Sequence, residues 1–316
     1  MMENRPTVSV IIPVFNREKL VRRTLDSIVA QEYRPLEIIV VDNNSSDGSL
    51  NVINDWMGEK NREDDKQLSL KLFEEKKKGA SAARNTGFRN SRGEYVIFFD
   101  SDDTMRQGLI EAAVKEMQSD SCPDMVCWKS ELHLLDGSTK VPPFMWHKPM
   151  EGHLIHALLR TQGFMSKRDL IEKTGGWNEK ITAWVDWEFG LRLLLVNPKL
   201  TGLDSVFVDI YSQKDSITGE TFSEKEGVWE NAIETVRKKV KQSEYPSKEK
   251  ILDILTYREI ILAAHYSMEG NKKGAKELKD KSLKGVGLKK GFIMRFAYHY
   301  TRHGGRGAWR IVRLFL

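Results

Sequence analysis

Cysteine is scarce in this chain of 316 residues, which has only Cys122 and Cys127. Two thiols make neither a disulfide framework nor a four-thiolate zinc site, so we expect a reducing compartment, the cytoplasm. No apolar run approaches the roughly eighteen residues of a membrane-spanning helix. The N-terminal MMENRPTVSV lacks the apolar core of a secretory signal. Proline and glycine, at 9 and 23 residues, are too rare for a collagenous or low-complexity protein.

Acidic residues are also rare near the C-terminus, although the whole chain has 50 Lys and Arg against 45 Asp and Glu. Residues 272–316 contain 13 Lys and Arg but only two acidic residues. A basic end of this kind favours an anionic partner. Its interleaved apolar residues suit a helix in a lipid headgroup region, and equally a packed C-terminal helix with a solvated basic face. Nucleic acid is disfavoured because no recognisable binding module accompanies the charge. The apolar residues are Phe292, Ile293, Phe296, Tyr298, Tyr300, Trp309, Ile311, Val312, Leu314 and Phe315.

Short apolar segments alternate with amphipathic ones over the first hundred residues. The predicted strands cover residues 8–14, 36–41, 68–73 and 94–99, and the predicted helices cover residues 18–30, 48–56 and 79–90. This alternation favours right-handed βαβ units. The predicted fold class is therefore α/β, with a Rossmann-like, mainly parallel central sheet flanked by helices. Ligands of such sheets bind beyond the carboxyl ends of the strands.

Acidic residues follow the second and fourth predicted strands. Asp42 ends the second strand, where it can accept hydrogen bonds from a base or a ribose. The fourth strand ends in Asp100-Ser101-Asp102-Asp103, a D-x-D pattern. Three carboxylates so close together repel one another unless a cation neutralises them. Oxygen ligands suit Mg²⁺ or Mn²⁺, which bridge to ligand phosphates. An ordinary acidic loop is the alternative.

Several longer stretches resemble the family 2 glycosyltransferases. They are VSVIIPVFNREKLVRRTLDSIVAQ, IIVVDNNSSDGS, KGASAARNTGFRNSRGEYVIFFDSDD and GGWNEKITAWVDWEFGLRLL, which together span about residues 7–195 in the order found in the family. The resemblance implies a GT-A fold, a nucleotide-diphosphate sugar donor and a divalent cation, Mn²⁺ or Mg²⁺. It also implies inversion at the anomeric carbon.

The resemblance assigns a donor site position by position. Asp102 would be the metal ligand, and Asp103 would help directly or through water. Arg84 matches an A-R-N element beneath the donor, although it could instead pair with a carboxylate inside the fold. The residues that match nucleotide or sugar contacts are Pro13, Phe15, Asn16, Glu18, Asp42, Ser45, Arg84, Asn85, Asp100 and Ser101.

A second matching constellation begins with the turn Gly175-Gly176-Trp177-Asn178-Glu179, which shapes the acceptor side in the family. Asp186 then corresponds to the general base that removes the acceptor's hydroxyl proton. Val185 departs from the family pattern, which usually has Glu there, although Glu188 is close along the chain. Asp186 could instead cap the helix that follows it. We expect Trp177, Trp184 and Glu188 at the acceptor site, whereas the seven histidines show no ligand pattern.

The alternation of strands and helices stops near residue 221. We expect a catalytic domain over residues 1–220, with a nucleotide-sugar half over about 1–105 and an acceptor half over about 106–220. Residues 221–316 form a helical extension with the basic amphipathic tail. The extension could pack on the catalytic domain, mediate self-association or bring the tail to the inner face of a membrane.

We expect transfer of a sugar, most readily from a UDP-linked donor, to a hydroxyl of a glycan or glycolipid. Val185 keeps open a non-catalytic nucleotide- or glycan-binding protein on the same fold. A nicotinamide-dependent oxidoreductase is disfavoured because the turn after the first strand, Pro13-Val14-Phe15-Asn16, lacks a glycine-rich phosphate loop. The same turn lacks the glycine-rich, basic loop expected of a nucleotidyltransferase.

Overall fold

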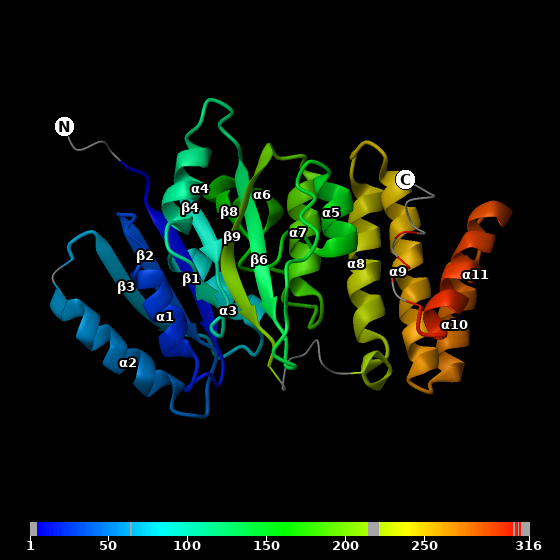
Figure 1. The fold of residues 1–316 in the computed structure, drawn as a ribbon, viewed down its shortest axis with the longest axis horizontal. Coiled ribbons are helices and arrows are strands. Elements are labelled where there is room, and N and C mark those ends of the chain that lie inside the picture. Colours follow the sequence, from blue (N-terminus) through cyan, green and yellow to red (C-terminus); the bar gives the residue numbers. More distant parts are fainter. Residues whose placement is uncertain (1–4, 64, 214–220, 306, 309, 311–316) are drawn as a thin grey trace. The chain divides into compact units, whose positions relative to one another are not determined.

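A computed structural model gives the fold of this chain (Figure 1) and describes residues 5–63, 65–213, 221–305, 307–308 and 310. The chain divides into two compact units. The first comprises residues 1–180 and 189–213, and the second comprises residues 181–188 and 214–316. The predicted domain boundary at residue 220 falls within residues 214–220, which lie outside the described residues, so this boundary stays a prediction.

All strands found among the described residues belong to the first unit. They are β1 (Val8–Val14), β2 (Leu36–Asp42), β3 (Leu68–Glu74), β4 (Tyr95–Phe98), β5 (Thr104–Met105), β6 (Met125–His133), β7 (Thr139–Lys140), β8 (Phe164–Lys167) and β9 (Leu200–Tyr211). Its helices are α1 (Val21–Val29), α2 (Ser49–Lys60), η1 (Asn61–Glu63), α3 (Ala80–Asn90), α4 (Leu109–Met117), α5 (Pro149–His156) and α6 (Arg168–Thr174). Helix α7 (Val185–Leu195) contains residues of both units.

The sheet has strand order β3-β2-β1-β4-β8-β6-β9-β5, with β7 paired to β6. Its first four strands are parallel, as the βαβ pattern predicts. Residues of β1 and β2 are buried throughout, which explains why both strands are continuous apolar runs. The α/β class is confirmed. The register places Val14 beside Asp42, so β1 and β2 end at the same edge of the sheet.

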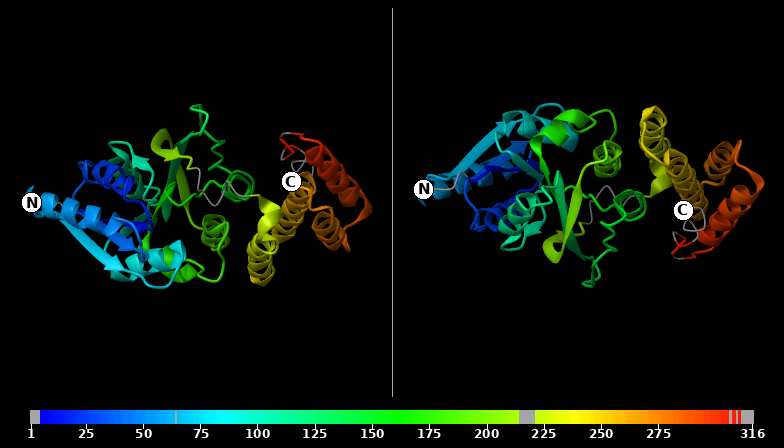
Figure 2. Two further views of the ribbon diagram at one scale, coloured as in Figure 1. Left: turned by 90° about the horizontal axis from the view of Figure 1, so that it is seen from below. Right: turned by 90° about the horizontal axis from the view of Figure 1, so that it is seen from above.

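Helices cover both faces of the parallel strands (Figure 2). Val10 and Ile12 of β1 belong to a core cluster that also contains apolar residues of α1, α2 and α4. Helix α3 packs on the other face, where Gly87 lies against Ile11 and Val41. A Cβ atom at Gly87 would lie 2.4 Å from Cγ2 of Ile11, so this position requires glycine. Both faces of the sheet are therefore buried.

The second half of the sheet was largely missed by the sequence patterns. Strands β6 and β8 are antiparallel to each other, and β8 is antiparallel to β4. Strand β9 lies between β6 and β5 in this half of the sheet. Two-residue β5 directly follows the acidic loop and pairs with Val208 and Asp209. Long-range pairing of this kind leaves no local signal in the sequence.

The second unit is helical. It contains η3 (Phe222–Lys225), α8 (Val228–Gln242), α9 (Lys248–Met268), α10 (Lys272–Leu283) and α11 (Leu288–Arg302). Helix α9 packs against the other three long helices, with α8 on one side and α10 and α11 on the other (Figures 1 and 2). Among the described residues, no helix combines the length and apolar character needed to cross a bilayer.

Candidate functional site

Hydrogen bonds join the loops that follow β1 and β2. The backbone N–H of Asn16 donates to Oγ of Ser45 at 3.0 Å, and the N–H of Ser46 donates to Oδ1 of Asn16 at 2.8 Å. Asn16 has a φ of 52°, a left-handed conformation that asparagine tolerates. Glu18 accepts from the N–H of Gly48 at 3.2 Å through Oε2. The structure thus brings the predicted contacts Asn16, Glu18 and Ser45 together, and it uses Glu18 to fix the second loop.

Asp42 ends β2 as a buried carboxylate that is only 3% exposed. Its Oδ2 accepts from the N–H of Ser45 at 3.0 Å. Its Oδ1 is buried and has no hydrogen-bond partner among the described residues. Pro13 is buried in β1, whereas the ring of Phe15 is 50% exposed at the end of that strand. Because buried acceptors are rarely left unpaired, Oδ1 of Asp42 fits a donor group supplied by a ligand.

Arg84 lies in α3, with its side chain beneath the acidic loop. Its Nη2 donates to Oδ1 of Asp100 at 2.6 Å, and its guanidinium carbon lies 4.4 Å from the ring centre of Trp177. The residue is 5% exposed, yet Nε and Nη1 have no hydrogen-bond partner among the described residues. Arg84 therefore pairs with a carboxylate, which was the alternative to a donor-site role considered from the sequence. Two buried donors nevertheless remain for an anionic or polar ligand.

Asp102 follows the buried Ser101 in the loop after β4. Burial of the Asp102 carboxyl raises its pKa, and the nearby charge of Asp100 raises this pKa further. Nε of Arg17 lies 3.3 Å from Oδ2 of Asp102 and partly offsets both effects. Asp100 and Asp102 thus crowd negative charge into a partly desolvated loop, a donor set that fits a divalent cation. The contact of Arg17 with Asp102 was not predicted, because nothing in the sequence around Arg17 indicates which carboxylate it meets.

Asp103 has a different environment from Asp102. Its Oδ1 accepts from the N–H of Tyr211 at 2.9 Å, and its Oδ2 accepts from Nε2 of Gln162. The residue is 3% exposed, and burial raises its pKa well above the usual value, with further contributions from Asp100 and Asp102. Both oxygens of Asp103 are thus used to anchor the acidic loop to neighbouring segments.

Asn85 connects α3 to the predicted acceptor-side turn. Its Nδ2 donates to the carbonyl of Trp177 at 2.9 Å and to Oε1 of Glu179 at 2.7 Å. Its Oδ1 accepts from the N–H of Trp177 at 2.8 Å. The ring of Trp177 is 3% exposed and stacks on Phe189 with ring centres 4.3 Å apart. Asn85 therefore fixes the turn, and the indole of Trp177 forms part of the interior of the first unit.

The predicted base and two acceptor residues lie on residues 181–188, described with the second unit. Asp186 occupies the first turn of α7, where its Oδ1 accepts from the N–H of Trp187 at 2.8 Å. The guanidinium carbon of Arg258, in α9, lies 4.6 Å from the ring centre of Trp184 and 4.5 Å from that of Trp187. Glu188 is 1% exposed.

Arg258 is half-buried, and its charge is stabilised by Asp186. Burial lowers the pKa of the Arg258 guanidinium to about 10, and the negative charge of Asp186 opposes this shift. The half-buried Trp184 also lies near Trp229 of α8, with ring centres 5.1 Å apart. The C-terminal helices thus supply the surroundings of the Asp186 segment. The sequence did not predict a role for Arg258, because it lies in the middle of a helical pattern that contains many charged residues.

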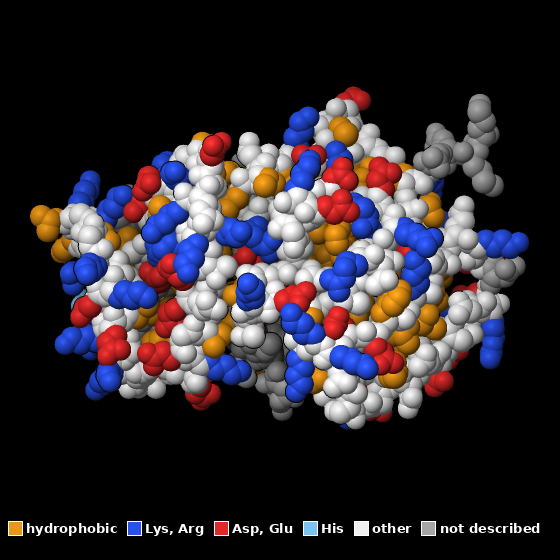
Figure 3. Space-filling model, turned by 180° about the vertical axis from the view of Figure 1, so that it is seen from behind, with side chains coloured by type: hydrophobic (Ala, Val, Ile, Leu, Met, Phe, Trp, Pro, Cys, Tyr) orange, Lys and Arg blue, Asp and Glu red, His pale blue; other side chains and the backbone are white. Residues whose placement is uncertain are grey.

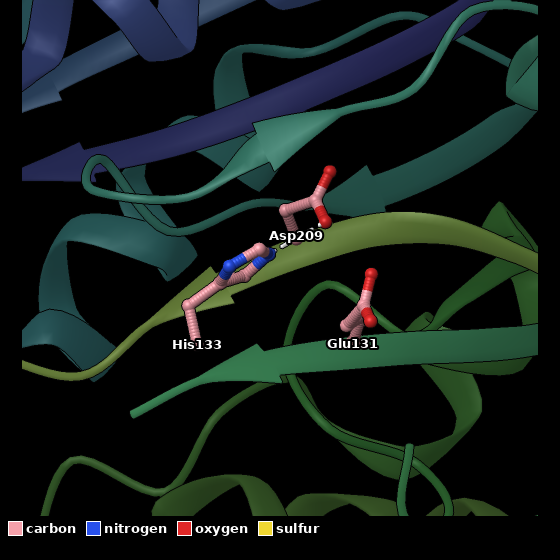
Figure 4. Close-up of side chains that lie close together, drawn as sticks. All are labelled: Glu131, His133 and Asp209. Atoms are coloured by element: carbon pink, nitrogen blue, oxygen red, sulfur yellow. Dashed lines mark hydrogen bonds and ion pairs between the residues drawn. The ribbon is translucent and has the colours of Figure 1, made fainter. Parts of the chain in front are cut away.

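A separate acidic cluster lies on β6 and β9, where ligand atoms of Glu131, His133 and Asp209 are within 4.8 Å of one another (Figure 4). Nη2 of Arg106 lies 2.5 Å from Glu131 and 2.6 Å from Asp209. Nε2 of His133 and Oδ1 of Asp209 are 2.8 Å apart. Because Arg106 forms ion pairs with both carboxylates, this cluster fits an ion-pair network that joins β6 to β9.

Comparison with known proteins relates the first part of the chain to a family. The family model described as glycosyl transferase family 2 matches residues 9–156, from β1 through α5. This match covers somewhat less than half of the chain. The matched residues include Asp42 at the end of β2, Arg84 in α3 and Asp102 in the loop after β4.

The curated relatives that resemble part of this chain are glycosyltransferases. Glycosyltransferase GlyA of Streptococcus pneumoniae is 38% identical over 110 residues, which are 35% of this chain and 15% of GlyA. A GalNAc(5)-diNAcBac-PP-undecaprenol beta-1,3-glucosyltransferase of Campylobacter jejuni is 34% identical over 111 residues, 35% of this chain and 34% of that protein. The matches therefore span about a third or less of the length of these relatives.

Solved structures extend the likeness to both units. S. aureus TarS residues 1–349, in complex with UDP-GlcNAc, has a TM-score of 0.70 at 16% identity and covers 98% of this chain and 90% of that one. The mannosyltransferase PcManGT of Pyrobaculum calidifontis, in complex with GDP-Man and Mn²⁺, has a TM-score of 0.53 at 20% identity. It covers 98% of this chain and 86% of that one. The predicted GT-A fold with C-terminal helices is confirmed.

Proposed function

We propose that this protein transfers a sugar from a nucleotide-diphosphate donor, a UDP-sugar, to a hydroxyl of a glycan or glycolipid. The observation that carries the proposal is a set of unpaired buried polar atoms at one edge of the parallel strands. Oδ1 of Asp42 is a buried acceptor, and Nε and Nη1 of Arg84 are buried donors. The Asp100–Asp103 loop follows β4 of the same sheet. The UDP-GlcNAc complex of TarS supports the choice of a uridine donor.

Asp42 recognises the base. Its Oδ1 accepts a hydrogen bond from an N–H of the uracil ring, while the Ser45 backbone keeps Oδ2 in place. Pro13, Phe15 and Asn16 line the base and ribose side of the site. Because the N–H of Ser45 already satisfies the second oxygen, the carboxylate has one defined orientation. Arg84 holds Asp100 and directs its remaining donors toward the donor sugar or its phosphates.

The donor set fits Mn²⁺ or Mg²⁺, because Asp102 and Asp100 are acidic oxygen ligands crowded in one loop. These two residues would hold the ion, and Asp103 would fix the loop through Gln162 and Tyr211. A bound divalent cation offsets the negative charge that develops on a diphosphate leaving group. The Mn²⁺ in the PcManGT structure supports this assignment.

Asp186 is the base of an inverting transfer. Its carboxylate removes the proton of the acceptor hydroxyl as the oxygen attacks the anomeric carbon from the face opposite the nucleoside diphosphate. The Trp187 N–H donates to Oδ1 of this carboxylate and helps to orient it. One carboxylate is sufficient for this step, so Val185 does not prevent it. Trp184 and Glu188 belong to the acceptor side of the reaction.

Two observations support the choice of acceptor class. The name of the C. jejuni relative specifies a glycan on an undecaprenol diphosphate, and residues 272–316 of this chain are strongly basic. We propose a lipid-linked or surface glycan as the acceptor, in polysaccharide biosynthesis of a cell envelope. The enzyme would then work in the cytoplasm at the inner face of the membrane.

Donor binding and chemistry can be tested separately with two variants. Melting temperatures measured with UDP, UDP-sugars and GDP-mannose, with and without Mn²⁺, report binding to the folded chain. We expect UDP to raise the melting temperature of Asp186→Asn as it does for wild type, whereas transfer falls about 10²–10⁴-fold. Asp102→Ala should lose the part of the shift that depends on Mn²⁺. Asp120→Asn, at an exposed acid, is the control and should match wild type.

The results distinguish the proposed enzyme from a binding protein. Absence of sugar transfer or donor hydrolysis by wild type, with UDP binding intact, would favour a non-catalytic nucleotide-binding protein. Transfer at the wild-type rate by Asp186→Asn would remove the base assignment. Chelator-sensitive activity that survives in Asp102→Ala would remove the metal assignment.

A further inference from the structure

Helix α11 exposes a continuous apolar stripe to solvent. Its four large apolar members recur at every fourth position and are 96%, 73%, 54% and 40% exposed along the chain. They are Leu288, Phe292, Phe296 and Tyr300. With about 100° of rotation per residue, they fall within about 120° of the helix surface. The rings of Phe296 and Tyr300 lie 6.2 Å apart and nearly parallel, which makes this part of the stripe a joined aromatic surface.

The opposite face of α11 supplies the contacts of the fold. Met294, Ala297 and Thr301 are buried there, and the helix packs against α9. Tyr298 is also buried, with Nζ of Lys279 5.1 Å from its ring centre. The apolar stripe therefore contributes little to the interior. Large contiguous apolar surface on a folded protein usually marks an interaction site.

The charged side chains of α11 itself are all positive. The helix contains no Asp or Glu, and Lys289, Arg295 and Arg302 are exposed on it. Lys290 of the same helix forms an ion pair with Asp253 of α9. The preceding helix α10 is also rich in lysine, and Lys and Arg side chains project from the C-terminal helices along the left edge of Figure 3.

We propose that the outer face of α11 docks on an anionic lipid bilayer. The helix lies in the plane of the surface, its aromatic and leucine side chains enter the headgroup region, and the flanking cations contact lipid phosphates. This interaction goes beyond the proposed sugar transfer and is independent of it. It uses only α11, since Trp309, Ile311, Val312, Leu314 and Phe315 of the predicted tail lie outside the described residues.

A second copy of this chain is a less suitable occupant. If two α11 stripes packed together, the Lys and Arg residues beside one stripe would face those beside the other. The helix has no carboxylate to compensate that repulsion. Anionic phospholipids supply the missing negative charge and an apolar phase together. Charge complementarity and exposed apolar area therefore favour the same occupant.

Vesicle co-flotation tests the proposal with the full-length protein. Wild type is compared with Phe292→Ser/Phe296→Ser on vesicles of phosphatidylcholine alone and of phosphatidylcholine mixed with phosphatidylglycerol. We expect wild type to float with the anionic vesicles, more weakly at high salt, and the double variant to lose at least about tenfold in apparent affinity. Leu135→Ser is the matched control, because Leu135 is 64% exposed in the first unit. Its binding should equal that of wild type.

Two further measurements make the result decisive. Both substituted side chains are exposed, so the melting temperature of the double variant should be close to that of wild type. If it is much lower, the vesicle experiment is repeated with Arg295→Glu, a substitution at an exposed position of the same helix. Light scattering should give the same oligomeric state for wild type and for the double variant. Undiminished vesicle binding by Phe292→Ser/Phe296→Ser, or a dimer lost in that variant without vesicle binding by wild type, would overturn the proposal. UDP binding should be unchanged in every variant, which separates this result from the proposed donor site.

Discussion

Nε of Arg17 lies 3.3 Å from Oδ2 of Asp102. The cation thus neutralises the carboxylate that we assign to the divalent metal, and it does so from the loop that also bears Asn16 and Glu18. A metal ion that binds Asp102 must share or displace this guanidinium. Under the proposed assignment, Arg17 therefore competes with the metal ion for Asp102, and mutation of Arg17 tests this.

Removing the charge of Arg17 should tighten cation binding. Partly exposed ion pairs contribute about 0.2–1 kcal/mol, so we expect Arg17→Gln to bind Mn²⁺ about two- to fivefold more tightly than wild type. Isothermal titration with Mn²⁺ in the absence of nucleotide measures this directly. Arg22→Gln is the control, because Arg22 pairs with Glu59 on the exposed side of α1. Equal Mn²⁺ affinity of wild type and Arg17→Gln would show that the pair does not compete.

Arg258 should tune the proposed base. Its buried guanidinium is stabilised by Asp186, and a nearby cation lowers the pKa of a carboxyl group. Arg258→Met removes that cation, so the acidic limb of the kcat/KM profile should move to higher pH by about one unit or more. Tyr257 is the other titratable group that acts on Arg258, and it is neutral in this pH range because burial raises its pKa.

Two companion variants separate positioning from folding. Arg258→Lys keeps the charge but loses the planar stacking on Trp184 and Trp187, so its acidic limb should stay near that of wild type while kcat falls. Arg237→Met removes a different ion pair of the helical unit, with Glu259, and should destabilise without moving the limb. An unchanged pH profile in Arg258→Met would refute the coupling to Asp186.

Glu37 should make stability depend on pH in acid. Burial raises its pKa, but hydrogen bonds from Lys71, from Ser9 and from the Arg92 N–H outweigh burial, so the folded-state pKa lies below 4.5. The stabilisation is therefore present above pH 4.5 and is lost as the pH falls through the folded-state pKa. Glu37→Gln should lose about 1.5–3 kcal/mol of unfolding free energy near neutral pH.

Urea unfolding at several pH values measures the difference between wild type and Glu37→Gln. The difference should shrink in acid, because the protonated Glu37 of wild type then resembles the amide. Glu94→Gln, at an exposed position, should show no such pH-dependent difference. A constant difference across the acid range would mean that the charge of Glu37 is not what stabilises this part of the sheet.

Much of the first hundred residues was predictable because its signals are local. Fully buried parallel strands are continuous apolar runs, so β1 was placed at residues 8–14 and β2 within one residue of its end. Strands β6 and β8 were missed because antiparallel pairing across distant segments leaves short, mixed patterns. The place of β9 between β6 and β5 depends on the same kind of long-range pairing.

The candidate site was likewise predictable only in part from the sequence. The amino-acid sequence alone was enough to predict the α/β class and the acidic residues at the strand ends, because both signals come from contiguous residues. Only the tertiary structure decided that Asp103 anchors its loop, that Arg17 meets Asp102, and that Arg258 lies between two indoles beside Asp186. These relationships depend on side-chain burial and on the pairing of charges distant in sequence, and no local pattern encodes either.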